Sequence, residues 1–252
     1  MKLATGIRTG LAVLLACTVV ATGSEKKQKT KSVVPHMVDS GSFGVFVKGQ
    51  RVVTETFSVE QGNGSSTIKS ELKEANGAAA LDQKSSLEIS TEGELIRYEW
   101  SQGGPTGAGL LVVPNNEFLL EKITTTASAK PAEQPFLMPN TSLILDNNFF
   151  VQREVLLWRY LAAACKPQNG AQQCQKEAAE FGVLVPQDRV SMRVRVELVG
   201  KEKVTIRGAE RELLRLNLTG EGFEWGLWVD ERDQFKLMRV AIPADNTEVV
   251  RD

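Results

Sequence analysis

Alternation of apolar and polar residues with a period of two is the feature that most constrains this chain. It is clearest at 192–198, where Met, Val, Val and Leu alternate with Arg, Arg and Glu. Successive side chains of a β-strand point to opposite faces, so this pattern indicates a strand with one face in a core. Further segments that we predict as strands are 43–59, 66–74, 85–90, 94–100, 110–113, 117–124, 204–206, 214–218, 223–227 and 235–242. Short strands joined by Gly and Asp turns predict a mainly β fold, namely a curled antiparallel sheet or incomplete β-barrel.

One long segment has a helical pattern instead. The predicted helix at 147–164 starts near Asp146 or Asn147, both good helix-capping residues, and is apolar over most of its circumference. Such a helix needs burial on most of its surface, so we expect it to pack against the sheet. A second, shorter helical stretch is predicted at 172–181.

The beginning of the chain has a pattern typical of export. Lys2 and Arg8 precede an apolar run at 11–21 that is too short to cross about 30 Å of hydrocarbon, so we interpret residues 1–23 as a signal peptide. Two processing routes remain open. One is ordinary cleavage near 21–23, which the shortness of the apolar run before Cys17 slightly favours. The other is cleavage at the lipobox-like Leu-Leu-Ala-Cys, with lipidation of Cys17. We expect a periplasmic or secreted protein, anchored to a membrane if Cys17 is lipidated.

Composition changes after this leader. Residues 24–42 are rich in Lys, Ser and Thr without an apolar period, which predicts a flexible basic linker. Beside a membrane anchor, such a linker could also contact anionic lipid. We predict a single antiparallel β domain at 43–243 and a C-terminal tail at 244–252. The net charge of −1 gives no electrostatic argument for a nucleic-acid partner.

The cysteines and the histidine limit the chemistry. Once Cys17 is removed or acylated, Cys165 and Cys174 remain, and export together with the intervening Pro and Asn-Gly favours a disulfide between them. Their spacing fits neither a Cys-x-x-Cys redox pair nor a zinc site. The single histidine, His36, lies in the predicted linker, which argues against Ser-His-Asp catalysis and two-histidine metal sites in the domain. The sequence therefore predicts no catalytic residue, metal ligand or cofactor.

The order of these parts resembles the lipoprotein-carrier (Lol-type) proteins of the cell envelope and related periplasmic families. The resemblance covers 43–242 in architecture: a Phe-Val-Val hairpin, a run of strands, an apolar helix, and further strands that end in a Trp-Val-Asp hairpin. It implies an incomplete barrel that holds acyl chains against a covering helix. The helix residues that would then line the ligand site are Phe149, Phe150, Val155, Trp158 and Leu161. The loop between Cys165 and Cys174 departs from the pattern of those carriers.

These observations lead us to expect non-enzymatic binding of a hydrophobic ligand, such as a lipid or acyl chain. Two alternatives remain open. One is an interaction or assembly factor that docks a protein partner through an exposed aromatic residue such as Trp228. The reason is that Trp225 and Trp228 fall on opposite faces of one strand, so they cannot both point into the same interior. The other is a hydrolase that uses carboxylates or a Ser-Lys pair. A dry apolar cavity, an outer aromatic patch or a cleft with converging carboxylates would distinguish the three.

Overall fold

The computed structural model of the protein describes residues 35–62, 64–74, 82–104, 107–126, 129–168, 171–175 and 177–252. The strands before the helix are β1 (His36–Val47), β2 (Gln50–Gln61), β3 (Ser65–Glu74), β4 (Gln83–Ser90), β5 (Leu95–Gln102), β6 (Gly109–Asn115), β7 (Phe118–Thr124), β8 (Ala132–Phe136) and β9 (Leu143–Ile144). Next come helix α1 (Val151–Ala164) and the strands β10 (Cys165–Gln168), β11 (Ala171–Cys174), β12 (Ala179–Val185), β13 (Val190–Ile206), β14 (Ala209–Gly220), β15 (Phe223–Asp230) and β16 (Lys236–Ile242). A short 3-10 helix (Pro243–Asp245) and β17 (Thr247–Arg251) end the chain.

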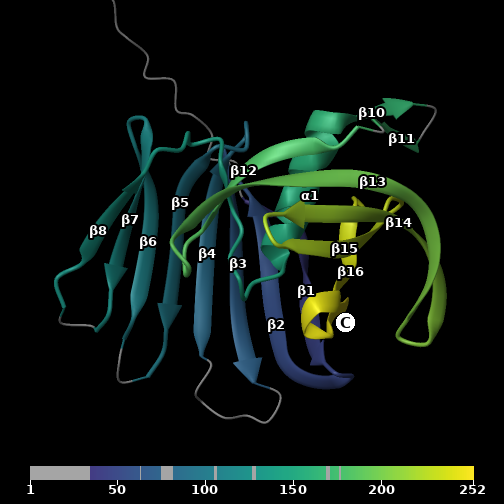
Figure 1. Ribbon diagram of the computed structural model, residues 1–252, viewed down its shortest axis with the longest axis horizontal. Helices are drawn as coiled ribbons and strands as arrows, with labels where there is room; N and C mark the ends of the chain where they lie inside the picture. Colours follow the sequence, from purple (N-terminus) through teal and green to yellow (C-terminus); the bar gives the residue numbers. More distant parts are fainter. Residues whose placement is uncertain are drawn as a thin grey trace, which may run out of the picture. The chain divides into compact units, whose positions relative to one another are not determined.

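Fifteen strands form one sheet in the order β8-β7-β6-β5-β4-β3-β2-β1-β17-β16-β15-β14-β13-β12-β9. All neighbours are antiparallel except β9, which runs parallel to β12. The sheet curls without closing into a barrel, and α1 lies within the curl (Figure 1). This confirms the predicted fold class. The expected alternation along β13 is also present, because Val194 and Val196 are buried while Arg193 and Arg195 are exposed.

The two ends of the described chain meet in the middle of the sheet. β1 and β17 pair with a register that places Phe43 opposite Arg251, and this pair joins the β1–β8 arm to the β12–β17 arm. The prediction that 244–252 is a tail is therefore wrong, because most of this segment is a central strand. The alternation of apolar and polar residues in this segment is too short to identify a strand from sequence. The hydrogen bonds that fix it come from β1 and β16.

The predicted linker 24–42 also needs correction at its end. β1 begins at His36, so 36–42 belong to a strand that pairs with β2 over most of its length. This part of the strand is polar and includes Gly41 and Ser42, so it lacks an apolar alternation that could mark it in the sequence. Asp39, the one fully enclosed residue of this stretch, is a charged residue whose partner lies on β17. Residues 1–34, which include the predicted signal peptide and Cys17, lie outside the described residues.

The predicted helix is confirmed, although it starts at Val151 rather than 147. The two capping candidates precede the helix as part of the connecting segment, and neither caps it, because the cap comes from another strand as described below. No helix in the described part of the chain has the length and apolarity that a membrane span requires.

The segment 172–181 was predicted to be helical and is not. It contains the end of β11 and the start of β12, separated by a short connection. Cys165 and Cys174 form a disulfide and lie opposite each other in the two-stranded β10–β11 sheet, while 179–181 pair with β13. This confirms the predicted disulfide. It also shows that the bond joins two strands of a hairpin that directly follows α1.

A second, smaller core lies on the outer face of the sheet. The long β13–β14 hairpin has an irregularity between Leu198 and Gly200, and its residues Val204, Ile206 and Leu213 pack against Trp228 and Met238. Trp225 packs instead with the main core, so the two tryptophans do lie on opposite faces, as predicted. However, Trp228 is only 5% exposed because the hairpin covers it. Trp228 therefore does not provide the exposed aromatic docking residue that the sequence suggested.

Candidate functional site

The first turn of α1 is fixed by a carboxylate from another strand. Glu55 of β2 accepts the backbone N–H of Phe150 at 2.6 Å and that of Val151 at 3.2 Å, and the Ser70 hydroxyl donates to it at 2.6 Å. The first N–H groups of a helix have no partner within the helix, so this side chain acts as its N-cap. Burial raises the pKa of Glu55 to about 7, against the opposing effect of these hydrogen bonds.

A buried arginine, Arg153, lies in the first turn of α1. Arg153 donates to the backbone carbonyls of Asp146 and Phe149, the latter at 2.7 Å. The Asp146 carboxyl in turn accepts hydrogen bonds from the Tyr98 hydroxyl and the Gln187 amide. Burial lowers the pKa of Arg153 to about 10 and raises the pKa of Asp146. This cluster connects the segment before α1 to β5 and to the turn after β12.

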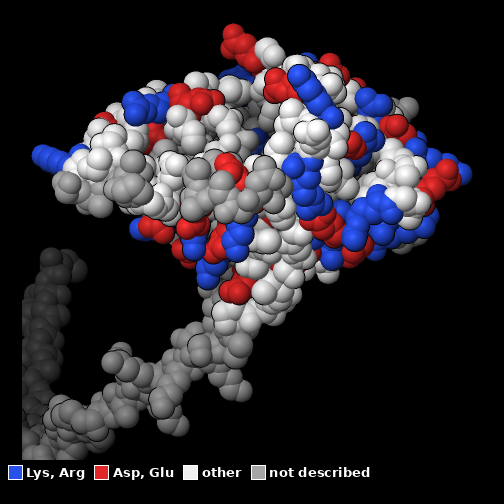
Figure 2. Space-filling view, turned by 90° about the horizontal axis from the view of Figure 1, so that it is seen from below, with Lys and Arg blue, Asp and Glu red and all other residues white. Residues whose placement is uncertain are grey.

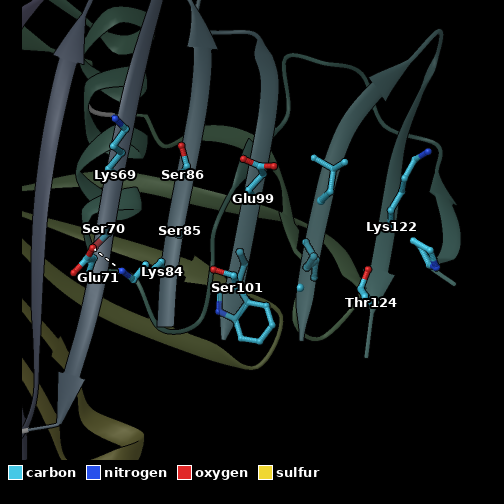
Figure 3. A pocket seen from close by; sticks show the side chains of 15 residues that line it. Lys69, Ser70, Glu71, Lys84, Ser85, Ser86, Glu99, Ser101, Lys122 and Thr124 are labelled. Carbon is cyan, nitrogen blue, oxygen red and sulfur yellow. Dashed lines mark ion pairs between the residues drawn. The ribbon is translucent and has the colours of Figure 1, made fainter. Parts of the chain in front are cut away.

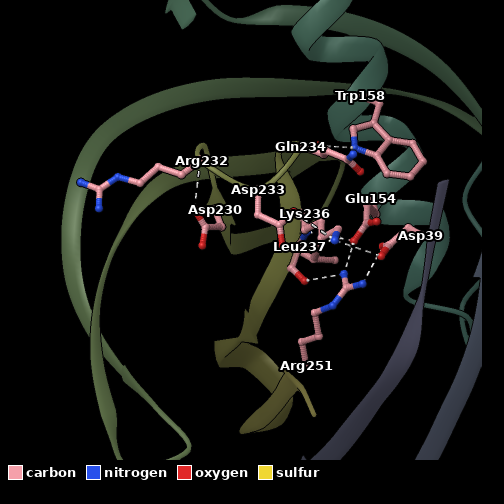
Figure 4. Close-up of polar contacts among 10 residues, drawn as sticks. All are labelled: Asp39, Glu154, Trp158, Asp230, Arg232, Asp233, Gln234, Lys236, Leu237 and Arg251. Atoms are coloured by element: carbon pink, nitrogen blue, oxygen red, sulfur yellow. Dashed lines mark hydrogen bonds and ion pairs between the residues drawn. The ribbon is translucent and has the colours of Figure 1, made fainter. Parts of the chain in front are cut away.

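A third cluster lies on the other side of the helix, beside β1, β16 and β17 (Figure 4). Arg251 donates to Glu154 at 2.8 Å and to Asp39 at 2.5 Å, while the Leu237 N–H donates to Glu154 at 2.9 Å and Lys236 lies 3.5 Å from Asp39. Burial and the neighbouring Asp39 raise the pKa of Glu154. The neighbouring Glu154 and Arg251 lower the pKa of Asp39 despite its burial. Asp39 therefore ionises more readily than Glu154.

These three clusters hold the helix and do not form an open site. Glu55, Arg153 and Glu154 are each 0% exposed, and Asp39 and Asp146 are also buried. Perturbed carboxyls often mark active sites, but structural networks shift pKa values as well, and a substrate would have to reach these groups. In the described ranges, no group of three or more His, Cys, Asp or Glu side chains is placed to hold a metal ion.

A hollow of about 540 Å³ lies on the outer face of β3 to β7 (Figure 3). Its charged side chains include Lys69, Lys84 and Lys122, and Glu71 pairs with Lys84 at 3.2 Å. Gly109 contributes to the depression because it adds no side chain to this surface. Acidic and basic side chains are also interspersed over the face seen in Figure 2. The outer hollow therefore combines charged side chains with apolar ones, among them Trp100, Leu110 and Leu111.

A second hollow, of about 310 Å³, lies where β5, β6 and β7 meet the turn after β12. We call it the inner hollow. Register pairs Trp100 with Leu110 and Leu110 with Ile123, so their side chains share one face of the sheet. The indole N–H of Trp100 donates to Gln83 at 3.2 Å, which fixes the ring. The residues that line the inner hollow are Trp100, Ala108, Gly109, Leu110, Ile123, Thr124, Thr125, Pro186, Gln187 and Arg189.

A buried acid lies next to the inner hollow. Glu121 belongs to the same strand and face as Ile123, two residues away, which places their Cα atoms about 7 Å apart. It is 0% exposed, and neither of its carboxyl oxygens has a hydrogen-bond partner in the described part of the protein. Burial raises the pKa of Glu121 to about 7, while the charge of Arg189 acts in the opposite direction.

The helix residues that the resemblance marks as ligand-lining are found in or against the main core. Phe149, Phe150 and Val155 are buried, and Trp158 and Leu161 are half-buried. The indole N–H of Trp158 donates to the carbonyl of Gln234 at 3.1 Å (Figure 4). None of the five lines the inner or the outer hollow. Their role in ligand binding stays a prediction.

Sequence reasoning did not single out the inner hollow. The sequence places Trp100 and Leu110 on two predicted strands without bringing them together, and the turn that carries Gln187 and Arg189 lies far from both in the chain. One signal was present: Glu121 interrupts an apolar alternation between Leu119 and Ile123, which predicts a charged side chain on an inward-facing position.

Comparison of the chain with protein-family models, with curated proteins and with solved structures found no match. The fold and the two hollows are therefore the basis for a functional argument.

Proposed function

We propose that this is an exported, non-enzymatic binding protein that holds a hydrophobic ligand, such as a lipid acyl chain, in the inner hollow. The observation that carries the proposal is the grouping of Trp100, Leu110 and Ile123 on one face of the sheet, with Trp100 and Ile123 only half-buried. Apolar side chains that converge on a concave surface are the usual lining of a ligand site.

The size of the inner hollow limits what it can hold. At about 310 Å³ it is at the lower end of the range of roughly 300 to 1,000 Å³ that is typical of ligand sites. One acyl chain or a flat ring system fits this volume better than a complete lipid. Each methylene that is buried there contributes about 0.8 kcal/mol of transfer free energy, before the cost of ordering the ligand.

The proposed location rests on separate observations. The pattern at 1–23 is typical of a secretory signal, and the disulfide between Cys165 and Cys174 is of a kind that persists in oxidising compartments. Intact mass measurement of the protein from its own host would distinguish the two processing routes. A mature chain beginning near residue 24 supports ordinary cleavage, and an acylated N-terminus at Cys17 supports a membrane anchor.

The two alternative functions have less support. The carboxyls with raised pKa values beside the helix are enclosed, so a hydrolase would need another set of groups. Trp228 is covered by the β13–β14 hairpin, so a docking function would need a different anchor.

Binding of N-phenyl-1-naphthylamine, a neutral hydrophobic dye, tests the proposal. We expect saturable fluorescence enhancement with the wild-type protein and weaker binding by Ile123→Ser, because serine removes apolar surface from the hollow. Trp158→Phe on the helix is the matched control and should bind like the wild type, with thermal unfolding used to show that both variants fold. Absence of dye binding by the wild type refutes the proposal. Loss in Trp158→Phe but not in Ile123→Ser would place the site at the helix instead.

A further inference from the structure

The inner hollow has one electrically charged side. Among its lining residues, Arg189 is the only one with an ionisable side chain. It follows Pro186 in a tight turn, where the Arg189 N–H donates to the Pro186 carbonyl at 3.1 Å, and it has a left-handed backbone with φ 56°. This turn fixes the arginine at the border between solvent and the apolar surface of Ile123. An exposed guanidinium beside an apolar surface attracts a molecule that has both an anionic and an apolar part.

Two acids lie near this arginine: Asp188, which precedes it in the turn and accepts a hydrogen bond from the Asn147 amide at 2.7 Å, and Glu121 on β7. Glu121 is enclosed, and the residues paired with it on the adjacent strands are uncharged: Val112 on β6 and Gln134 on β8. Tyr98, next to Val112 on β5, uses its hydroxyl to bind Asp146. Because burial favours the neutral form of Glu121, this acid competes less for Arg189 in mildly acidic solution than at higher pH.

We propose that the natural ligand of the inner hollow is an anionic amphiphile, an acyl chain that ends in a carboxylate. The carboxylate pairs with Arg189, and the chain lies against Trp100 and Ile123. This inference rests on the proposed function, since it names the class of ligand for the same site.

Two dyes with the same ring skeleton test the charge preference. N-phenyl-1-naphthylamine is neutral, and 8-anilinonaphthalene-1-sulfonate adds one anionic group. We expect Arg189→Gln to weaken binding of the sulfonate roughly 2- to 5-fold, the range for an exposed ion pair, and to weaken binding of the neutral dye less. Arg189→Lys should retain most of the sulfonate affinity. Arg193→Gln, which removes an exposed arginine of β13, should have no effect. Decanoate should displace the neutral dye, and more weakly in Arg189→Gln.

The pH dependence gives an independent readout. Wild-type protein should bind the sulfonate and decanoate more tightly at pH 6 than at pH 8, because ionised Glu121 competes for Arg189. Glu121→Gln should remove most of this difference.

The outcomes separate the two proposals. If the neutral dye does not bind to the wild type, the proposed function fails and this inference fails with it. If the neutral dye binds and Ile123→Ser weakens it, but Arg189→Gln affects both dyes equally or neither, the inner hollow is a ligand site without a preference for anions. That result overturns the inference alone.

Discussion

Replacement of Glu55 by glutamine should change how the stability of the protein depends on pH. Glu55 is 0% exposed and caps α1 through the N–H groups of Phe150 and Val151. Glutamine has nearly the same shape but does not titrate, and its amide group can accept with only one of its two terminal atoms. The substitution therefore removes a proton-binding group and one helix-capping acceptor while the packing is retained.

The magnitude follows from the pKa of Glu55, which burial raises from 4.5 to about 7. This carboxyl binds a proton more tightly in the folded than in the unfolded state. The folded protein therefore holds more protons between these two values, and its stability falls as the pH rises through them. The difference of about 2.5 pKa units corresponds to about 3 kcal/mol, most of it lost between pH 5 and pH 8.

Urea unfolding at a series of pH values measures this effect as a change in the transition midpoint at constant slope. At pH 5, Glu55→Gln should be less stable than the wild type by roughly 1 to 3 kcal/mol, because a buried N–H loses its acceptor. At pH 8 this deficit should disappear or reverse, because the ionised, buried Glu55 destabilises the folded wild type. Buried Glu121 and Glu154 titrate in the same direction in both proteins, so the difference between wild type and variant isolates Glu55.

Glu60→Gln, on the same strand but outside the cluster, controls for the removal of a carboxyl. The reasoning is refuted if Glu55→Gln retains the pH slope of the wild type, or if wild-type stability rises between pH 5 and pH 8.

Three further predictions concern the other clusters. Arg251→Met should destabilise the fold by about 3 to 5 kcal/mol in urea unfolding, because it leaves buried carboxyls without their cation. Adding Glu154→Gln should recover part of that loss. Equal stability of the single variant and the wild type would contradict this prediction. Replacing both Cys165 and Cys174 by serine should lower stability by at most about 3 kcal/mol and speed hydrogen exchange in the β10–β11 hairpin, whereas unchanged exchange would show that the hairpin holds without the bond. Purified protein should contain no stoichiometric zinc by elemental analysis, and His36→Ala should bind the neutral dye like the wild type; zinc that the wild type binds and His36→Ala loses would show that His36 has a role.

Much of the architecture was accessible from sequence because it depends on local periodicity. Strands such as β13 show the alternation of one buried and one exposed face, and α1 shows an apolar surface that requires cover. The disulfide between Cys165 and Cys174 followed from counting thiols in a chain that we expect to be exported. Errors occurred where local pattern is weak. Residues 36–42 and 247–251 are strands because neighbouring strands supply their hydrogen bonds, and these neighbours are remote in sequence.

The candidate site depended on tertiary structure for a different reason. Trp100, Ile123 and Arg189 belong to separate strands and a turn, and nothing in the sequence states which register or which curl of the sheet brings them together. The sequence by itself determined a mainly β chain with one buried helix, a disulfide and no histidine chemistry in the strands beyond β1. Only the tertiary structure decided that charged residues such as Glu55 lie in the core against the helix, and where an apolar hollow remains. Periodicity specifies which face of an element is buried, whereas the partner of that face is set by long-range packing.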